Sequence, residues 1–141
     1  MEPGFNTLEW KSALPPSIRT LWDDVCTSMD AGTFTLVPHG TRALVNRVAR
    51  DLAGATDSAS FAESVQLLVA KEVIRRQDEE PLMVVVEAGN AAAHRELDLN
   101  EDHARVLVLI VENLLRSAYL PQKAVEAVKK AIPPRNPPKR H

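Results

Sequence analysis

The chain has 141 residues, of which 45% are hydrophobic, 26% charged and 4% aromatic, and its formal net charge is −2. A chain of this length can bury the core of one domain, and its single cysteine, Cys26, excludes an internal disulfide and a multi-thiolate zinc site. No stretch approaches the ~20 apolar residues of a membrane span, and the first residues lack the basic start and apolar run of a signal peptide, so we expect a cytoplasmic protein with no membrane partner.

The first two predicted helices are bounded by prolines and glycines. Pro15 and Pro16 open the first, and Gly32 ends it. The second is expected to begin near Thr41 and to stop at Gly54. The apolar side chains of the first helix recur at helical spacing, at Ile18, Leu21, Trp22, Val25 and Met29.

Two more helices are predicted in the middle of the chain. Ser60 and Glu63 have the spacing of a capping box, in which each side chain satisfies a free backbone N–H group of a helix start. A fourth helix follows, with Pro81 in its first turn. The valine-rich segment 82–86 also has strand propensity, but a lone strand would have no partner, so we expect helix.

The last third of the chain predicts a fifth helix capped by Asn100 and a short sixth helix that Pro121 restarts and that runs to Ala131. Residues 132–141 hold four prolines and three Lys or Arg residues with no acidic residue, which predicts a disordered basic tail. The expected organisation is an N-terminal segment of residues 1–13, a helical domain of residues 14–131 and this tail.

One predicted helix carries unusual polarity. Gly89 is the only glycine expected inside a helix, where it costs about 1 kcal/mol relative to alanine. Asn90 and His94 stand four apart on one face, and Glu87 lies two turns before His94. This row either fixes the packing of a neighbouring helix by hydrogen bonds or performs proton chemistry. No histidine spacing typical of a metal site occurs, so we expect neither a metal nor a cofactor.

The second predicted helix carries three arginines. Arg42, Arg47 and Arg50 could form a phosphate-binding face, or they could be a solvated face paired with acids such as Asp51.

The order of several short motifs resembles a known bacterial family, the one catalogued as domain of unknown function 4145. The resemblance spans about residues 14–131, and Gly-Asn-x-x-x-His is its most specific element. The motifs are Leu14-Pro15-Pro16, Gly40-Thr41-Arg42-Ala43-Leu44-Val45, Gly89-Asn90-Ala91-Ala92-Ala93-His94, Val111-Glu112-Asn113-Leu114-Leu115 and Tyr119-Leu120-Pro121.

That family is regarded as a relative of the HEPN superfamily (higher eukaryotes and prokaryotes nucleotide-binding), whose helical domains often dimerise and in many members cut RNA. The resemblance implies an all-α, orthogonal HEPN-like bundle of five to six helices. The signature of active HEPN ribonucleases is Arg, a polar residue, three variable residues and His. Asn90 and His94 match its second and last positions, whereas Gly89 stands in place of the arginine.

The missing arginine bears on catalysis. Metal-independent RNA cleavage needs a group that moves a proton at the ribose 2′-hydroxyl, which His94 could be, and a cation that stabilises the phosphate. Arg95 follows His94 but points about 100° away from it, which makes it a poor substitute for the missing arginine, and Glu87 would repel a phosphate. Together with the three arginines of the second helix, Arg95 is a candidate nucleic-acid-binding residue.

Three hypotheses remain open from the sequence. The leading one is a HEPN-like interaction module without nuclease activity, which forms a homodimer or docks on a protein partner in a nucleic-acid-directed system such as phage defence. The second is a metal-independent ribonuclease that uses His94 with Arg42, Arg47 or Arg50 supplied from elsewhere, including a partner chain. The third is a toxin- or nucleotide-binding accessory protein whose cleft holds a small phosphorylated ligand near Asn90. RNA and a nucleotide are the candidate non-protein partners.

Overall fold

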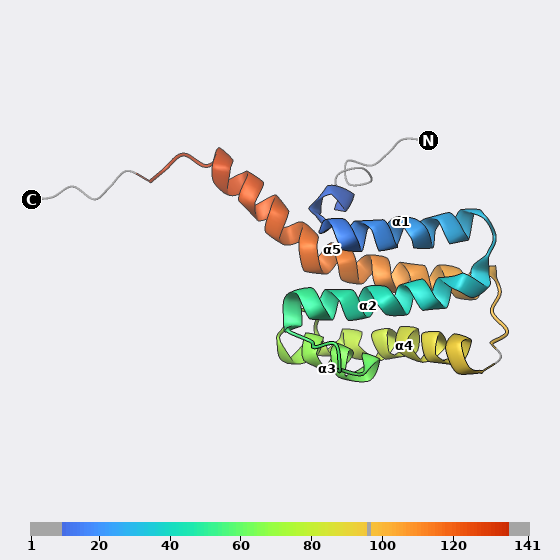
Figure 1. Cartoon of the computed structure of the whole chain (residues 1–141). Helices are drawn as coiled ribbons and strands as arrows, with labels where there is room; N and C mark the ends of the chain where they lie inside the picture. Colours follow the sequence, from blue (N-terminus) through green and yellow to red (C-terminus); the bar gives the residue numbers. More distant parts are fainter. Residues whose placement is uncertain (1–9, 96, 136–141) are drawn as a thin grey trace, which may run out of the picture.

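Helix α2 lies at the centre of the molecule and contacts each of the other four α-helices (Figure 1). The computed structural model describes residues 10–95 and 97–135. Within these residues the fold is all-helical, with no strand. In chain order the elements are η1 (Trp10–Ala13), α1 (Pro16–Asp30), η2 (Phe34–Leu36), α2 (Val37–Ala53), α3 (Phe61–Ala70), η3 (Arg76–Asp78), α4 (Glu79–His94) and α5 (Glu101–Ala131).

The start of α2 differs from the sequence expectation, and its end confirms it. The helix begins at Val37, four residues before the predicted start, because Pro38 occupies the first turn, where a proline costs no intrahelical hydrogen bond. Gly54 ends it as predicted, in the left-handed conformation with φ 72°.

Helix α1 packs on one side of α2, and the preceding turn η1 contacts α5. The Trp10 and Trp22 rings meet edge to face, with centroids 5.3 Å apart, and both are buried. Trp10 therefore anchors the end of the predicted N-terminal segment onto the bundle; residues 1–9 of that segment lie outside the described residues. Gly40 of α2 faces Val25 of α1 so closely that an added Cβ would lie 2.5 Å from Val25 Cγ2.

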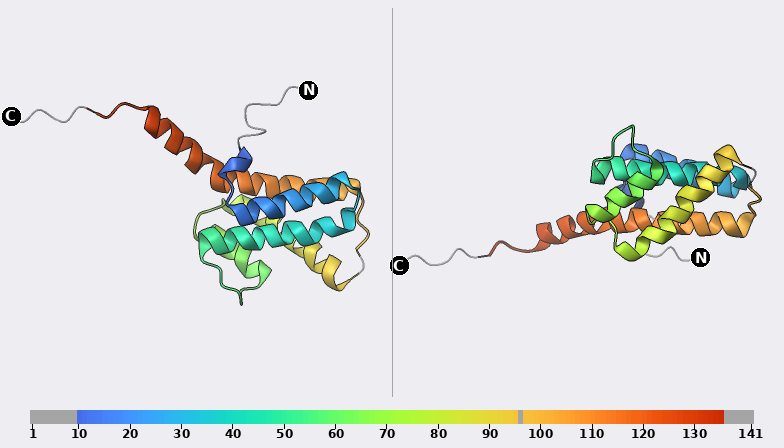
Figure 2. Two further views of the ribbon diagram at one scale, coloured as in Figure 1. Left: turned by 45° about the horizontal axis from the view of Figure 1, so that its top comes forward. Right: turned by 90° about the horizontal axis from the view of Figure 1, so that it is seen from below.

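Helices α3 and α4 cover the opposite side of α2, and α4 runs obliquely to α5 (Figure 2). The capping box is confirmed, since Ser60 Oγ accepts from the Glu63 backbone and Glu63 Oε1 accepts from the Ser60 backbone. The ambiguous segment is helical as predicted. Val85 and Val86 are buried in α4, whose period of 3.6 residues directs them toward α2 and the core.

Helix α5 is one continuous helix where a fifth and a short sixth helix were predicted. It continues through Pro121 to Ala131, so the predicted break at this proline is wrong. A proline inside a helix lacks one N–H donor and bends the helix without having to end it when both flanks favour helix. Figure 1 shows α5 changing direction as it leaves the bundle. We call residues 121–131 the arm; all of them are exposed.

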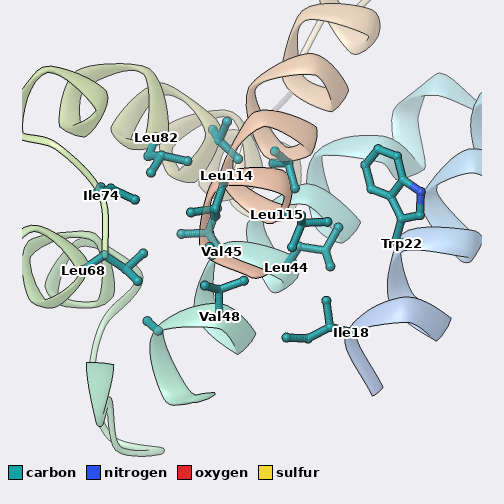
Figure 3. Close-up of a cluster of buried hydrophobic side chains, with 14 of the residues drawn as sticks. Ile18, Trp22, Leu44, Val45, Val48, Leu68, Ile74, Leu82, Leu114 and Leu115 are labelled. Carbon is teal, nitrogen blue, oxygen red and sulfur yellow. The ribbon is translucent and has the colours of Figure 1, made fainter. Parts of the chain in front are cut away.

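The core lies between α2 and the helices around it (Figure 3). Leu44, Val45 and Val48 of α2 are fully buried. They meet side chains from every other α-helix, among them Ile18, Trp22, Leu68, Leu82, Leu114 and Leu115. No helix in the described part of the chain combines the length and the apolar character needed to cross a membrane. After α5 the backbone is extended at Ile132, and residues 136–141 of the predicted tail lie outside the described residues.

The base of the arm is joined to α2 by one side-chain hydrogen bond. Tyr119 donates its hydroxyl to Asp51 Oδ2 at 2.8 Å. Burial and the neighbouring Asp51 carboxylate raise the pKa of Tyr119 well above its ordinary value.

This bond predicts a pH dependence of stability. A pKa raised in the folded state contributes stability that is complete below the unfolded pKa of about 10 and is lost as the pH rises above it. We expect Tyr119→Phe to lower the free energy of unfolding by about 0.5–1.5 kcal/mol at pH 7. The difference from wild type should shrink between pH 9 and 11 in urea titrations. A difference that stays constant over this range would contradict the prediction.

Candidate functional site

The face of α4 that carries Gly89 and Asn90 lies against Arg42 of α2. Gly89 is buried, and an added Cβ there would lie 2.6 Å from both Cβ and Cδ of Arg42. The absence of a side chain at this position therefore lets the aliphatic part of Arg42 lie directly on the backbone of α4. The side chain of Arg42 thus fills the space beside position 89.

Arg42 is held by two neutral groups. Its Nη1 donates to Asn90 Oδ1 at 2.8 Å, and its guanidinium carbon lies 4.4 Å from the ring centroid of Phe61, the first residue of α3. Its Nε is buried and has no hydrogen-bond partner within the described part of the chain. Arg42 thus ties α2, α3 and α4 together through a half-buried cation that neither contact neutralises.

The predicted polar row of Glu87, Asn90 and His94 is divided among different contacts. Asn90 is half-buried and turned to Arg42. Glu87 is exposed and forms an ion pair with Arg95, which follows the end of α4. His94 is the last residue of α4 and is exposed. Within the described residues, Asn90 is the one member of this row that hydrogen-bonds to another helix, through Arg42.

The arginines of α2 do not form one basic face. Arg42 turns to α3 and α4, whereas Arg47 and Arg50 line a shallow hollow with Ser17 at the start of α1. Arg50 pairs with Asp57 at 3.1 Å, and the expected acid Asp51 instead accepts from Tyr119. The neighbours of α2 therefore separate Arg42 from Arg47 and Arg50, and phosphate binding by any of these arginines stays a prediction.

Two other kinds of reactive side chain are potential metal ligands and the thiol of Cys26. No group of three or more His, Cys, Asp and Glu side chains suited to a metal ion is found in residues 10–95 and 97–135. Burial raises the pKa of the Cys26 thiol above its ordinary value, which keeps it protonated and unreactive at neutral pH.

Comparison with known protein families identifies residues 23–135 with a family model described as Domain of unknown function (DUF4145). The chain belongs to this family. The match begins nine residues after the expected start at Leu14 and ends four residues past Ala131, so it includes the whole arm. No curated protein matches the chain, and no solved structure does.

Two features of this DUF4145 domain were not predicted from its sequence. The pairing of Arg42 with Asn90 joins residues 48 positions apart, and no local pattern announces it. The exposed apolar side chains of the arm were missed because Pro121 was expected to end the fifth helix. The continuous spacing of apolar residues across Pro121, at Leu114, Ala118, Val125 and Val128, was the signal that could have shown one helix.

The Arg42–Asn90 contact predicts an energetic coupling between α2 and α4. We expect Arg42→Ala and Asn90→Ala each to destabilise the protein, with a coupling energy of about 1 kcal/mol in a double-mutant cycle measured by urea unfolding. Arg47→Ala is the matched control, because this arginine is exposed on the same helix, and it should change stability by less than about 0.5 kcal/mol. Additive effects of the two substitutions would show that the contact is not formed in solution.

Proposed function

We propose that this chain is a HEPN-like helical interaction module without nuclease activity, acting as a homodimer or on a protein partner. The observation that carries the proposal is the hydrogen bond from Arg42 to Asn90. The Asn90 oxygen accepts an internal hydrogen bond, the guanidinium of Arg42 lies over the ring of Phe61, and the aliphatic part of Arg42 packs against Gly89. Groups committed to packing are poorly placed to follow charge as it develops on a substrate.

The charged residues near His94, and His94 itself, support the same proposal. Arg95, the other cation near His94, is paired with Glu87, whose carboxylate would repel a phosphate. His94 is exposed at a helix end rather than enclosed with a partner that would orient its ring. The family resemblance favours a setting in a nucleic-acid-directed system such as phage defence.

A second candidate is a metal-independent ribonuclease. It is favoured by the half-buried guanidinium of Arg42, whose hydrogen-bond and ring contacts within the described residues include no carboxylate, and by His94 one turn after Asn90. In this reading Arg42 would stabilise the charge on the phosphate and His94 would move the proton, so the arginine missing at position 89 would come from α2 of the same chain.

An RNA cleavage assay in EDTA separates the two functions. We expect the purified protein to leave a mixed RNA substrate intact, and the His94→Ala and Arg42→Ala variants to behave identically to wild type. His39→Ala is the matched control, since His39 is an exposed histidine in the first turn of α2. Cleavage that His94→Ala abolishes and His39→Ala preserves, with the helical circular dichroism unchanged, would overturn the interaction module in favour of the ribonuclease.

A further inference from the structure

The apolar stripe of α5 does not end where the bundle ends. Within the bundle it consists of Ala104, Leu107, Val111, Leu114 and Ala118, which are at most 6% exposed. The alternating spacing of three and four residues continues without interruption into the arm and past its end, at Pro121, Val125, Val128 and Ile132. There the last three side chains are 50%, 58% and 60% exposed. This spacing is the a/d pattern by which helices pack against one another.

The arm is held in position at its base. Lys123 donates to the backbone oxygen of Ser12 in η1 at 3.0 Å, and Tyr119 bonds to Asp51 of α2. Between η1 and the arm runs an open groove of about 630 Å³ whose lining includes Ala13, Tyr119 and Val125. A helix fixed in this way loses less conformational freedom on binding than a free segment would.

Charge is distributed unevenly between the arm and the bundle. Residues 121–141 hold six Lys and Arg residues against one Glu, which leaves eleven basic and eighteen acidic side chains on residues 1–120. The tip of the arm is basic through Lys129 and Lys130. One turn before the base of the arm, Ser117 shares a groove with Pro81 and Leu82 in the first turn of α4. Glu79 and Glu80 belong to this turn, and the groove itself is lined by Arg75 and Asp78, which pair with each other.

An antiparallel pair of arms would bury both apolar stripes and place basic residues against acidic ones. In such a pair the basic tip of each arm lies against the acidic base of the other, and the two stripes cover one another around a two-fold axis. An arm of eleven residues is only about 16 Å long, so a stable interface also needs the groove beside η1. A nucleic acid would use the lysines of the tip but would leave the valines exposed to water.

We propose that the arm of α5 is a dimerisation element, and that its occupant is the arm of a second copy of this chain in antiparallel orientation. The inference rests on the proposed interaction function and names its partner and surface. Each copy supplies Val125, Val128 and Ile132 to the shared apolar seam. Lys129 and Lys130 of each copy face Glu79 and Glu80 at the base of the other arm.

The test is the mass of the full chain in solution, measured by light scattering and sedimentation at 10–100 µM. We expect twice the chain mass for wild type, and a shift of the Val125→Asp/Val128→Asp variant to the monomer, with the dissociation constant raised at least ~100-fold. Leu109→Asp is the matched control, because Leu109 is 57% exposed on the same helix outside the stripe, and it should remain a dimer.

A charge exchange tests the orientation and does not depend on the apolar variant. Lys129→Glu/Lys130→Glu should weaken the dimer at low salt, and adding Glu79→Lys/Glu80→Lys in the same chain should restore it. A monomeric wild type, or a dimer that persists in the Val125→Asp/Val128→Asp variant, would overturn the arm pairing. Lower RNA binding with an unchanged mass in the Lys129→Glu/Lys130→Glu variant would assign the tip to nucleic acid instead and overturn the pairing as well.

The lack of nuclease activity and the pairing of the arms are tested by different measurements. A dimer that cleaves RNA through His94 would refute the lack of nuclease activity and leave the arm pairing in place. A monomer that leaves RNA intact would refute the arm pairing alone.

Discussion

Two glycines allow the central helix α2 to approach its neighbours closely. Gly89 of α4 accommodates the aliphatic part of Arg42, and Gly40 of α2 accommodates Val25 of α1. A methyl group at either position would lie 2.5–2.6 Å from a neighbouring carbon, well inside van der Waals contact. The loss of helix propensity at these glycines is thus offset by the closeness of helices that share one core.

This close approach also decides what the polar residues of α4 can do. Because the backbone of α4 lies against Arg42, the guanidinium reaches Asn90 and the ring of Phe61. Arg42 therefore fills the space beside position 89 and is held by contacts with α3 and α4.

Helix α5 has two roles along its length. Its first half supplies buried side chains to the core, and its last eleven residues leave the bundle as the arm while keeping the same apolar spacing. The contacts of Lys123 and Tyr119 at the base fix the direction in which the arm leaves. A helix that is held at its base and apolar along one exposed stripe is suited to bind another helix.

Much of the local structure could be predicted from the sequence. The capping box at Ser60, the glycine stop at Gly54 and the helical character of residues 82–86 were predicted correctly, because capping and apolar period act over a few residues. Two boundaries were wrong for local reasons. Pro38 lies in the first turn of α2, and Pro121 lies inside α5, since a proline is tolerated in both contexts at a cost that flanking helix formers offset.

The candidate site was predictable only in part. The sequence placed Asn90 and His94 on one helix face and marked Gly89 as unusual, and the family match over residues 23–135 agrees with the resemblance on which these residues were selected. The sequence could not show that Arg42 would meet Asn90 while Arg47 and Arg50 turn to α1, because this depends on how α2 is rotated among four neighbours. The sequence by itself determined where helices form and which faces are apolar, whereas tertiary packing decided which polar side chains meet and which part of the apolar stripe stays exposed. Periodicity and caps are properties of a short segment, but contacts between distant residues depend on the relative placement of whole helices.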